Sequence, residues 1–127
     1  MIPYIITDGV VEMMFMKPSD PKFGGPDWQI AKGGVDEGET SQEAAIREAK
    51  EELGLFIGNI VDDKVEKLMA WSGIEFFCCE VESKYMFGEP HYETGAVTWM
   101  TSDEFKQTGR LFQQPVVEHL ANKLANR

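Results

Sequence analysis

The segment from Thr40 to Gly54 constrains the fold more than any other part of the chain. Thr40 and Glu43 have the spacing of a capping box, in which each side chain accepts a hydrogen bond from the other residue's backbone N–H. Gly54 follows as a typical C-terminal stop, because glycine adopts the left-handed conformation at low cost. An apolar stripe at helical spacing lies between the two ends: Ala45, Ile46, Ala49 and Leu53. We therefore expect a helix over residues 40–53 that packs one side against the core.

Short apolar segments separated by turn residues surround this helix. Asp8-Gly9 indicates a hairpin, and Ser72-Gly73 indicates a second break between strands. Three prolines and two glycines in residues 17–26 indicate a loop. The expected strands cover residues 4–7, 10–16, 28–31, 64–71, 73–81 and 95–100.

Two further helices are expected after the last strand. Ser102 is the expected cap of a short helix over residues 102–107, and residues 114–126 have an amphipathic pattern. Strands around one central helix, with a closing helix, predict an α/β (α+β) fold in which a mixed sheet is packed between helices. A length of 127 residues suits a single domain, so residues 1–127 are expected to form one.

The charge balance limits the partners of the chain. Twelve Lys and Arg face 22 Asp and Glu, for a net charge of -10, which argues against a broad nucleic-acid surface. No apolar stretch approaches the roughly 18 residues of a membrane span, and no basic signal region follows Met1. Cys78 and Cys79 are adjacent and should point to opposite faces of a strand, so they are expected to stay reduced. These features predict a cytoplasmic protein without a membrane partner, and its oligomeric state stays open.

Three glutamates on the predicted helix carry the chemistry. Glu48, Glu51 and Glu52 lie at positions i, i+3 and i+4, so their carboxylates project from one face and repel one another. A solvated acidic face is one explanation. A bound hard cation is another, because Mg²⁺ prefers oxygen ligands and bridges to substrate phosphates. Such a cation would also allow an acidic site to hold an anionic substrate.

The segment before the helix favours the cation. The glycines at 33, 34 and 38 make a loop whose backbone can approach a ligand closely. Lys32 at its entrance is a plausible phosphate contact. Residues 33–55 resemble the Nudix box, G-x(5)-E-x(7)-R-E-U-x-E-E-x-G-U, in which U is a bulky aliphatic residue. Ala49 alone departs from the pattern, and the positions that match are Gly33, Glu39, Arg47, Glu48, Glu51, Glu52, Gly54 and Leu55.

The resemblance to Nudix hydrolases implies a role for each matching residue. Glu48, Glu51, Glu52 and the Gly33 carbonyl would hold Mg²⁺ or Mn²⁺. Arg47 and Glu39 would orient the glutamates through charge-assisted hydrogen bonds. The catalytic base would come from the box, as Glu51 or Glu48, or from a later loop, where Glu93 is the first candidate and Glu89 the second.

The resemblance also implies hydrolysis of a diphosphate linkage in a nucleoside diphosphate derivative. The stretch from Trp28 to Gly33 is similar to the Trp-x-x-Pro-Lys-Gly of dinucleoside polyphosphate hydrolases, with Ala31 in place of the proline. A dinucleoside polyphosphate or a nucleotide is therefore the expected substrate. Lys32, Phe23, Trp28 and Tyr92 are the expected substrate contacts. The alternatives are a non-catalytic nucleotide sensor and an isoprenoid diphosphate isomerase.

Overall fold

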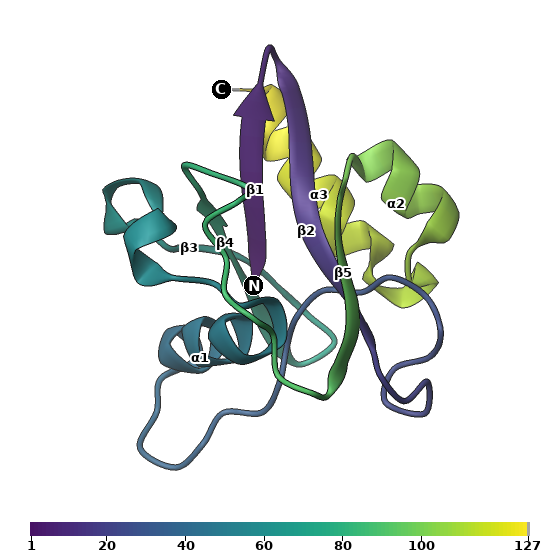
Figure 1. The fold of residues 1–127 in the computed structure, drawn as a ribbon. Coiled ribbons are helices and arrows are strands. Elements are labelled where there is room, and N and C mark those ends of the chain that lie inside the picture. Colours follow the sequence, from purple (N-terminus) through teal and green to yellow (C-terminus); the bar gives the residue numbers. More distant parts are fainter. Residues whose placement is uncertain (127) are drawn as a thin grey trace.

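The structure is a computed structural model that describes residues 1–126, and its centre is one mixed sheet (Figure 1). The strand order is β3-β4-β1-β2-β5, in which β1 and β4 run parallel and every other neighbouring pair is antiparallel. The bounds are Ile2–Thr7 for β1, Val10–Pro18 for β2, Glu66–Trp71 for β3, Ile74–Glu80 for β4 and Thr94–Met100 for β5.

Helices cover both faces of this sheet, as Figure 1 shows. Helix α1 (Ser41–Leu53) packs on one face, and α2 (Ser102–Thr108) and α3 (Gln114–Ala125) pack on the other. Three single 3₁₀ turns, Ile57–Asn59, Val61–Asp63 and Leu111–Gln113, fill connections in which the sequence indicated no element. The predicted mixed sheet between helices is confirmed.

Alternation along the strands divides the core into two layers. Successive strand side chains point to opposite faces, so Met13 and Phe15 pack toward α2 and α3, whereas Met14 and Met16 pack toward α1. Cys78 and Cys79 follow the same rule, and each is buried in a different layer. The expectation that the two cysteines do not bridge is confirmed.

The ends of α1 agree with the sequence. The Thr40 hydroxyl accepts from the Glu43 N–H, and the Glu43 carboxylate accepts from the Thr40 N–H at 2.9 Å. Gly54 ends the helix with a φ of 77°, and a Cβ at this position would collide with the backbone of Gly88. The glycine therefore allows residue 88, within the connection from β4 to β5, to pack directly against the end of α1.

Two local predictions are wrong. Residues 28–31 form no strand, because Trp28 and Gln29 make only isolated bridges, to Gly109 and Met16. The cap of α2 is Thr101, whose hydroxyl accepts from the Glu104 N–H in a second capping box. Either hydroxyl residue is a good cap, and the glutamate three residues on selects Thr101 rather than Ser102. No helix within residues 1–126 is long and apolar enough to cross a membrane.

Candidate active site

Arg47 organises the segment between the glycine loop and α1. Its Nε and Nη2 donate to the two oxygens of Glu39, at 2.8 and 3.1 Å, and Nη2 also donates to the Gly34 carbonyl at 2.9 Å. Nη1 donates to Glu48 at 2.8 Å. Because one guanidinium makes all of these contacts, it fixes the loop and one glutamate at the same time. These hydrogen bonds from Arg47 hold the pKa of the Glu39 carboxyl below its usual range.

Gly33 lies directly against Glu48. A Cβ built on Gly33 would lie closer than 3 Å to the Glu48 carboxyl group, whereas a Cβ on Gly34 would meet nothing within 4 Å. The Gly33 backbone therefore touches the carboxylate on one side while Arg47 holds it on the other. This is a close approach that any larger residue at position 33 would prevent.

Glu52 is the member of the cluster with an unsatisfied oxygen. Its Oε2 is buried and has no hydrogen-bond partner among the described residues. Burial is the main reason that the pKa of Glu52 is raised to about 7, and the nearby Glu48 carboxylate raises it further. A buried carboxylate oxygen without a donor is costly, and a positive ligand would remove that cost.

Glu52 opens onto a cleft of about 690 Å³. Small-molecule sites are typically about 300–1,000 Å³, so a nucleotide-sized ligand fits this volume. The lining comes from β2, the loop after it, the glycine-loop entrance, the loop before β5 and the segment after α2. It consists of Met16, Pro18, Ser19, Asp20, Phe23, Gly24, Gln29, Ile30, Lys32, Glu52, Tyr92, Glu93 and Arg110.

The loop that carries Glu93 is tied to both walls of the cleft. The His91 N–H donates to the Glu51 carbonyl at 2.6 Å, and the Thr94 hydroxyl donates to the Glu52 carbonyl at 2.9 Å. From the other wall, the Ser19 N–H donates to the Glu93 carbonyl at 2.8 Å. The backbone of Glu93 is thus fixed beside the end of α1, while its side chain is 71% exposed and faces solvent and the cleft.

The structure separates the predicted site residues into two groups. Glu52, Glu93, Lys32, Phe23 and Tyr92 meet in the cleft, although they span 71 positions of the sequence. The remaining predicted residues do not line it. The network next to the cleft consists of Gly33, Glu39, Arg47 and Glu48, and Glu51 is half exposed near Arg47. Glu89 borders a different hollow with Phe56 and Ile57. Trp28 packs against the core beneath Lys17.

Sequence reasoning missed one cation of the cleft, Arg110. It lies just after α2, and its backbone N–H donates to the Trp28 carbonyl at 2.7 Å. Within the sequence it is an isolated arginine next to a glycine, with no periodic or spaced partner. Only the packing of α2 against β2 brings it to the cleft, so no local signal could have found it.

The carboxylates fit a divalent cation in chemistry, although their present arrangement does not gather them. In the part of the chain that the structure describes, no three His, Cys, Asp or Glu side chains stand close enough together to hold a metal ion. Glu48 and Glu51 are both paired with Arg47, at 2.8 and 3.6 Å from its Nη1. The unpartnered Glu52 oxygen and the all-oxygen donor set are what a hard cation such as Mg²⁺ or Mn²⁺ requires.

Comparison with known proteins gives the same family as the box. The sequence model of the NUDIX domain matches residues 4–120. A curated relative, RNA pyrophosphohydrolase of Shewanella sediminis, is 59% identical over 34 residues, which are 27% of this chain and 20% of that protein. The RNA pyrophosphohydrolase of Shewanella baltica is 56% identical over the same length and shares. The chain therefore spans about a fifth of the length of the curated relatives it matches.

Solved structures share the fold at low identity. The C. elegans Ap4A hydrolase in a binary complex has a TM-score of 0.77 and 22% identity, and the match covers 99% of this chain and 95% of that one. The NUDIX domain of Shewanella oneidensis NrtR, complexed with ADP ribose, has a TM-score of 0.67 and 15% identity over 97% and 84% of the two chains. Fold, box and family model agree, and this chain belongs to the NUDIX family.

Proposed function

We propose that the protein is a pyrophosphohydrolase that uses Mg²⁺ or Mn²⁺ to cut a diphosphate linkage in a nucleoside diphosphate derivative. The observation that carries this proposal is the buried, unpartnered Oε2 of Glu52 at the wall of a nucleotide-sized cleft. Glu48, Glu51, Glu52 and the Gly33 carbonyl would hold the cation. When bound, it supplies neutralisation of phosphate charge and activation of water.

The chain's own residues would prepare the site for that chemistry. Arg47 holds Glu48 and Glu39 in place, so the carboxylate of Glu48 is set before substrate arrives. Lys32 lies in the cleft beside Glu52 and would bind a phosphate of the substrate. Glu93 would accept a proton from the attacking water, because its backbone is fixed beside α1 and its carboxylate reaches the same cleft.

The proposed substrate is a dinucleoside polyphosphate or a nucleotide. The size of the cleft and its pair of cations, Lys32 and Arg110, support a ligand with several phosphates. Phe23 and Tyr92, exposed by 71% and 81%, offer flat apolar surfaces at the cleft for a base. The Ap4A hydrolase and the RNA pyrophosphohydrolases among the similar proteins support the same class.

A hydrolysis screen with product identification by mass tests this proposal. The panel should contain dinucleoside polyphosphates, nucleoside triphosphates, 5′-triphosphorylated RNA and an isoprenoid diphosphate, each with Mg²⁺ or Mn²⁺. Phosphate-bond cleavage in the panel supports a hydrolase, binding without cleavage supports a nucleotide sensor, and an isomerised product supports an isomerase. The structure disfavours the isomerase, because Cys78 and Cys79 are buried and neither lines the cleft.

The first prediction concerns the base. Glu93→Gln should lower kcat by about 100-fold, the lower end of what a general base supplies. Glu89→Gln is the matched control, because Glu89 lies four residues earlier in the same loop but borders a different hollow. Steady-state kinetics between pH 5 and 9 would check both variants. Equal losses in the two would contradict the assignment of Glu93.

The second prediction concerns the aromatic rings. Phe23→Ala and Tyr92→Ala should each raise KM about three- to tenfold with little change in kcat, because base stacking is worth about 1 kcal/mol in an exposed position. Leu111→Ala removes an equally exposed apolar side chain, 78% accessible, that does not line the cleft, and serves as control. A change in kcat without a change in KM would show that these rings do not bind the substrate.

A further inference from the structure

Arg110 is a cation of the cleft that forms no ion pair with a carboxylate of the described residues. Its side chain is half-buried, and within residues 1–126 its guanidinium makes neither an ion pair nor a side-chain hydrogen bond. The guanidinium carbon lies 5.9 Å from the centroid of the Phe112 ring. In a chain with a net charge of -10, a half-buried arginine without a carboxylate partner is unusual and indicates an external anion.

Asp20 and Lys32, two other charged residues of the cleft, already have a neighbour of opposite charge. The Asp20 carboxylate lies 3.6 Å from the Lys22 ammonium, so it already has a cation beside it. Lys32 lies beside Glu52, where it opposes part of the rise in the Glu52 pKa. It therefore belongs to the wall that carries the glutamates. Within residues 1–126 Arg110 forms no ion pair with Asp20, Glu52 or Glu93, which line the same cleft, so its five N–H donors remain available to a ligand.

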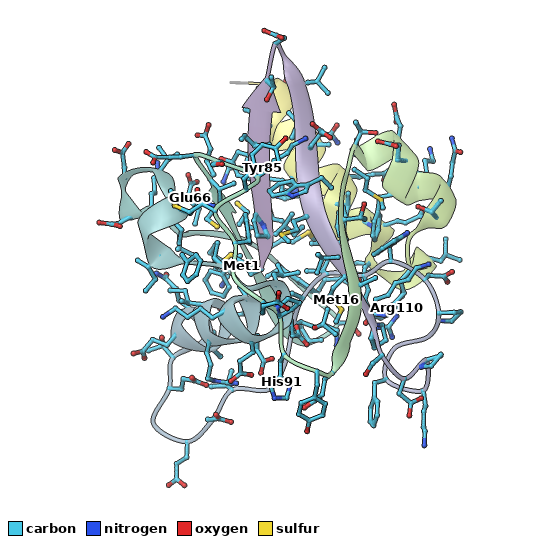
Figure 2. The ribbon with its side chains drawn as sticks, in the orientation of Figure 1. Met1, Met16, Glu66, Tyr85, His91 and Arg110 are labelled. Atoms are coloured by element: carbon cyan, nitrogen blue, oxygen red, sulfur yellow. The ribbon has the colours of Figure 1, made fainter. Side chains whose placement is uncertain are left out.

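The position of Arg110 sets what it can contact. Glu52 comes from the end of α1, on one face of the sheet, whereas Arg110 follows α2, on the other face. In the view of Figure 2, Arg110 lies on the α2 side and His91 on the α1 side, with Met16 of the cleft lining between them. Glu52 and Arg110 thus approach the same cleft from opposite faces of the sheet, so a phosphate chain that starts at Glu52 would extend toward Arg110.

We propose that Arg110 binds a phosphate beyond the scissile diphosphate, so that the cleft selects nucleotides with three or more phosphates over those with two. A guanidinium fork matches two phosphate oxygens at once, which gives direction as well as attraction. The inference rests on the proposed function for the location of the scissile diphosphate. In this proposal, the contact with Arg110 makes binding depend on the number of phosphates in the ligand.

Equilibrium binding of non-hydrolysable analogues tests this selection without turnover. A methylene-bridged nucleoside triphosphate and the matching diphosphate are titrated, with Mg²⁺, into the wild type, Arg110→Gln, Arg110→Lys and Lys106→Gln. We expect Arg110→Gln to weaken the binding of the triphosphate about tenfold and that of the diphosphate less than about twofold. The reason is that one charged hydrogen-bonded pair is worth about 1.5 kcal/mol or more. The triphosphate affinity of Arg110→Lys should lie between those of the wild type and Arg110→Gln, because lysine keeps the charge but cannot bind two oxygens at once.

Lys106→Gln is the matched control, because it removes one positive charge from an exposed position of α2 outside the cleft. It should change neither affinity. Thermal unfolding should be unchanged in every variant, since the backbone bond of Arg110 to Trp28 does not depend on the side chain. Equal weakening of both analogues by Arg110→Gln, no weakening, or a wild type that does not prefer the triphosphate would overturn the inference. Length-selective binding without hydrolysis would refute the proposed activity alone.

Discussion

Glu52→Gln is expected to lower kcat by about 100- to 1,000-fold, the loss typical of removing one preorganised electrostatic group from a catalytic site. The same substitution is expected to make the metal-free protein more stable. Both effects have one cause, which is that the Glu52 carboxylate is buried beside Glu48 with one oxygen unpartnered. The buried charge that lowers the stability of the metal-free protein is the charge that a divalent cation would bind.

The stability effect of Glu52 has a definite sign and pH window. Its pKa is raised from 4.5 to about 7 in the folded protein, mainly by burial, so the folded state binds more protons than the unfolded state between these values. The part of the folding stability that depends on Glu52 is therefore fully present below about pH 4.5. It is lost as the pH rises from there through 7. The full shift corresponds to at most about 3 kcal/mol, and glutamine should recover about 1–2 kcal/mol, because its neutral amide still lacks a partner.

Urea unfolding in the presence of a chelator would measure this difference. Glu52→Gln should match the wild type near pH 4.5 and exceed it at pH 8, whereas adding Mg²⁺ should raise the melting temperature of the wild type more than that of the variant. Glu118→Gln is the control, because it removes the same charge from an exposed position of α3. Undiminished kcat, or a variant less stable than the wild type at pH 8, would contradict the role of Glu52.

The sequence predicted the parts of the site that local spacing encodes. Glu52, Arg47 and Gly33 follow from the register of one helix and the loop before it, and the capping box and Gly54 fix where that helix begins and ends. Glu93 was predicted from its position in a loop before a strand, and its side chain does line the cleft; its role as base stays a prediction.

The remainder of the site depends on tertiary packing that spacing does not encode. Arg110 reaches the cleft only because α2 packs on β2, and the bond of its backbone to Trp28 joins positions 82 apart. The error at residues 28–31 has a similar origin. The apolar composition of residues 28–31 suits a strand. However, Gln29 bridges β2 only at Met16, and the Ile30 N–H donates to the Gln113 side chain.

Gly33→Ala is expected to lower kcat/KM about 100-fold, although it adds a single methyl group. The new Cβ would lie closer than 3 Å to the Glu48 carboxyl, which has to move by about 1 Å, and misplacement of that size in an active site costs about 100-fold. Arg47 opposes the movement, because its Nη1 holds the same carboxylate at 2.8 Å. The strain therefore falls on the position of the Glu48 carboxylate, a proposed metal ligand, and the fold itself is little affected.

Gly34→Ala is the matched control for this prediction. A Cβ at Gly34 meets nothing within 4 Å, and neither glycine has a positive φ, so neither alanine is placed in the left-handed backbone region. Gly34→Ala should keep kcat/KM within about twofold, and both variants should melt within a few degrees of the wild type, as expected for changes below about 1 kcal/mol. Similar activity in the two variants would mean that Glu48 moves freely. In that case its contact with Gly33 would not set the position of the carboxylate, and Arg47 alone would have to do so.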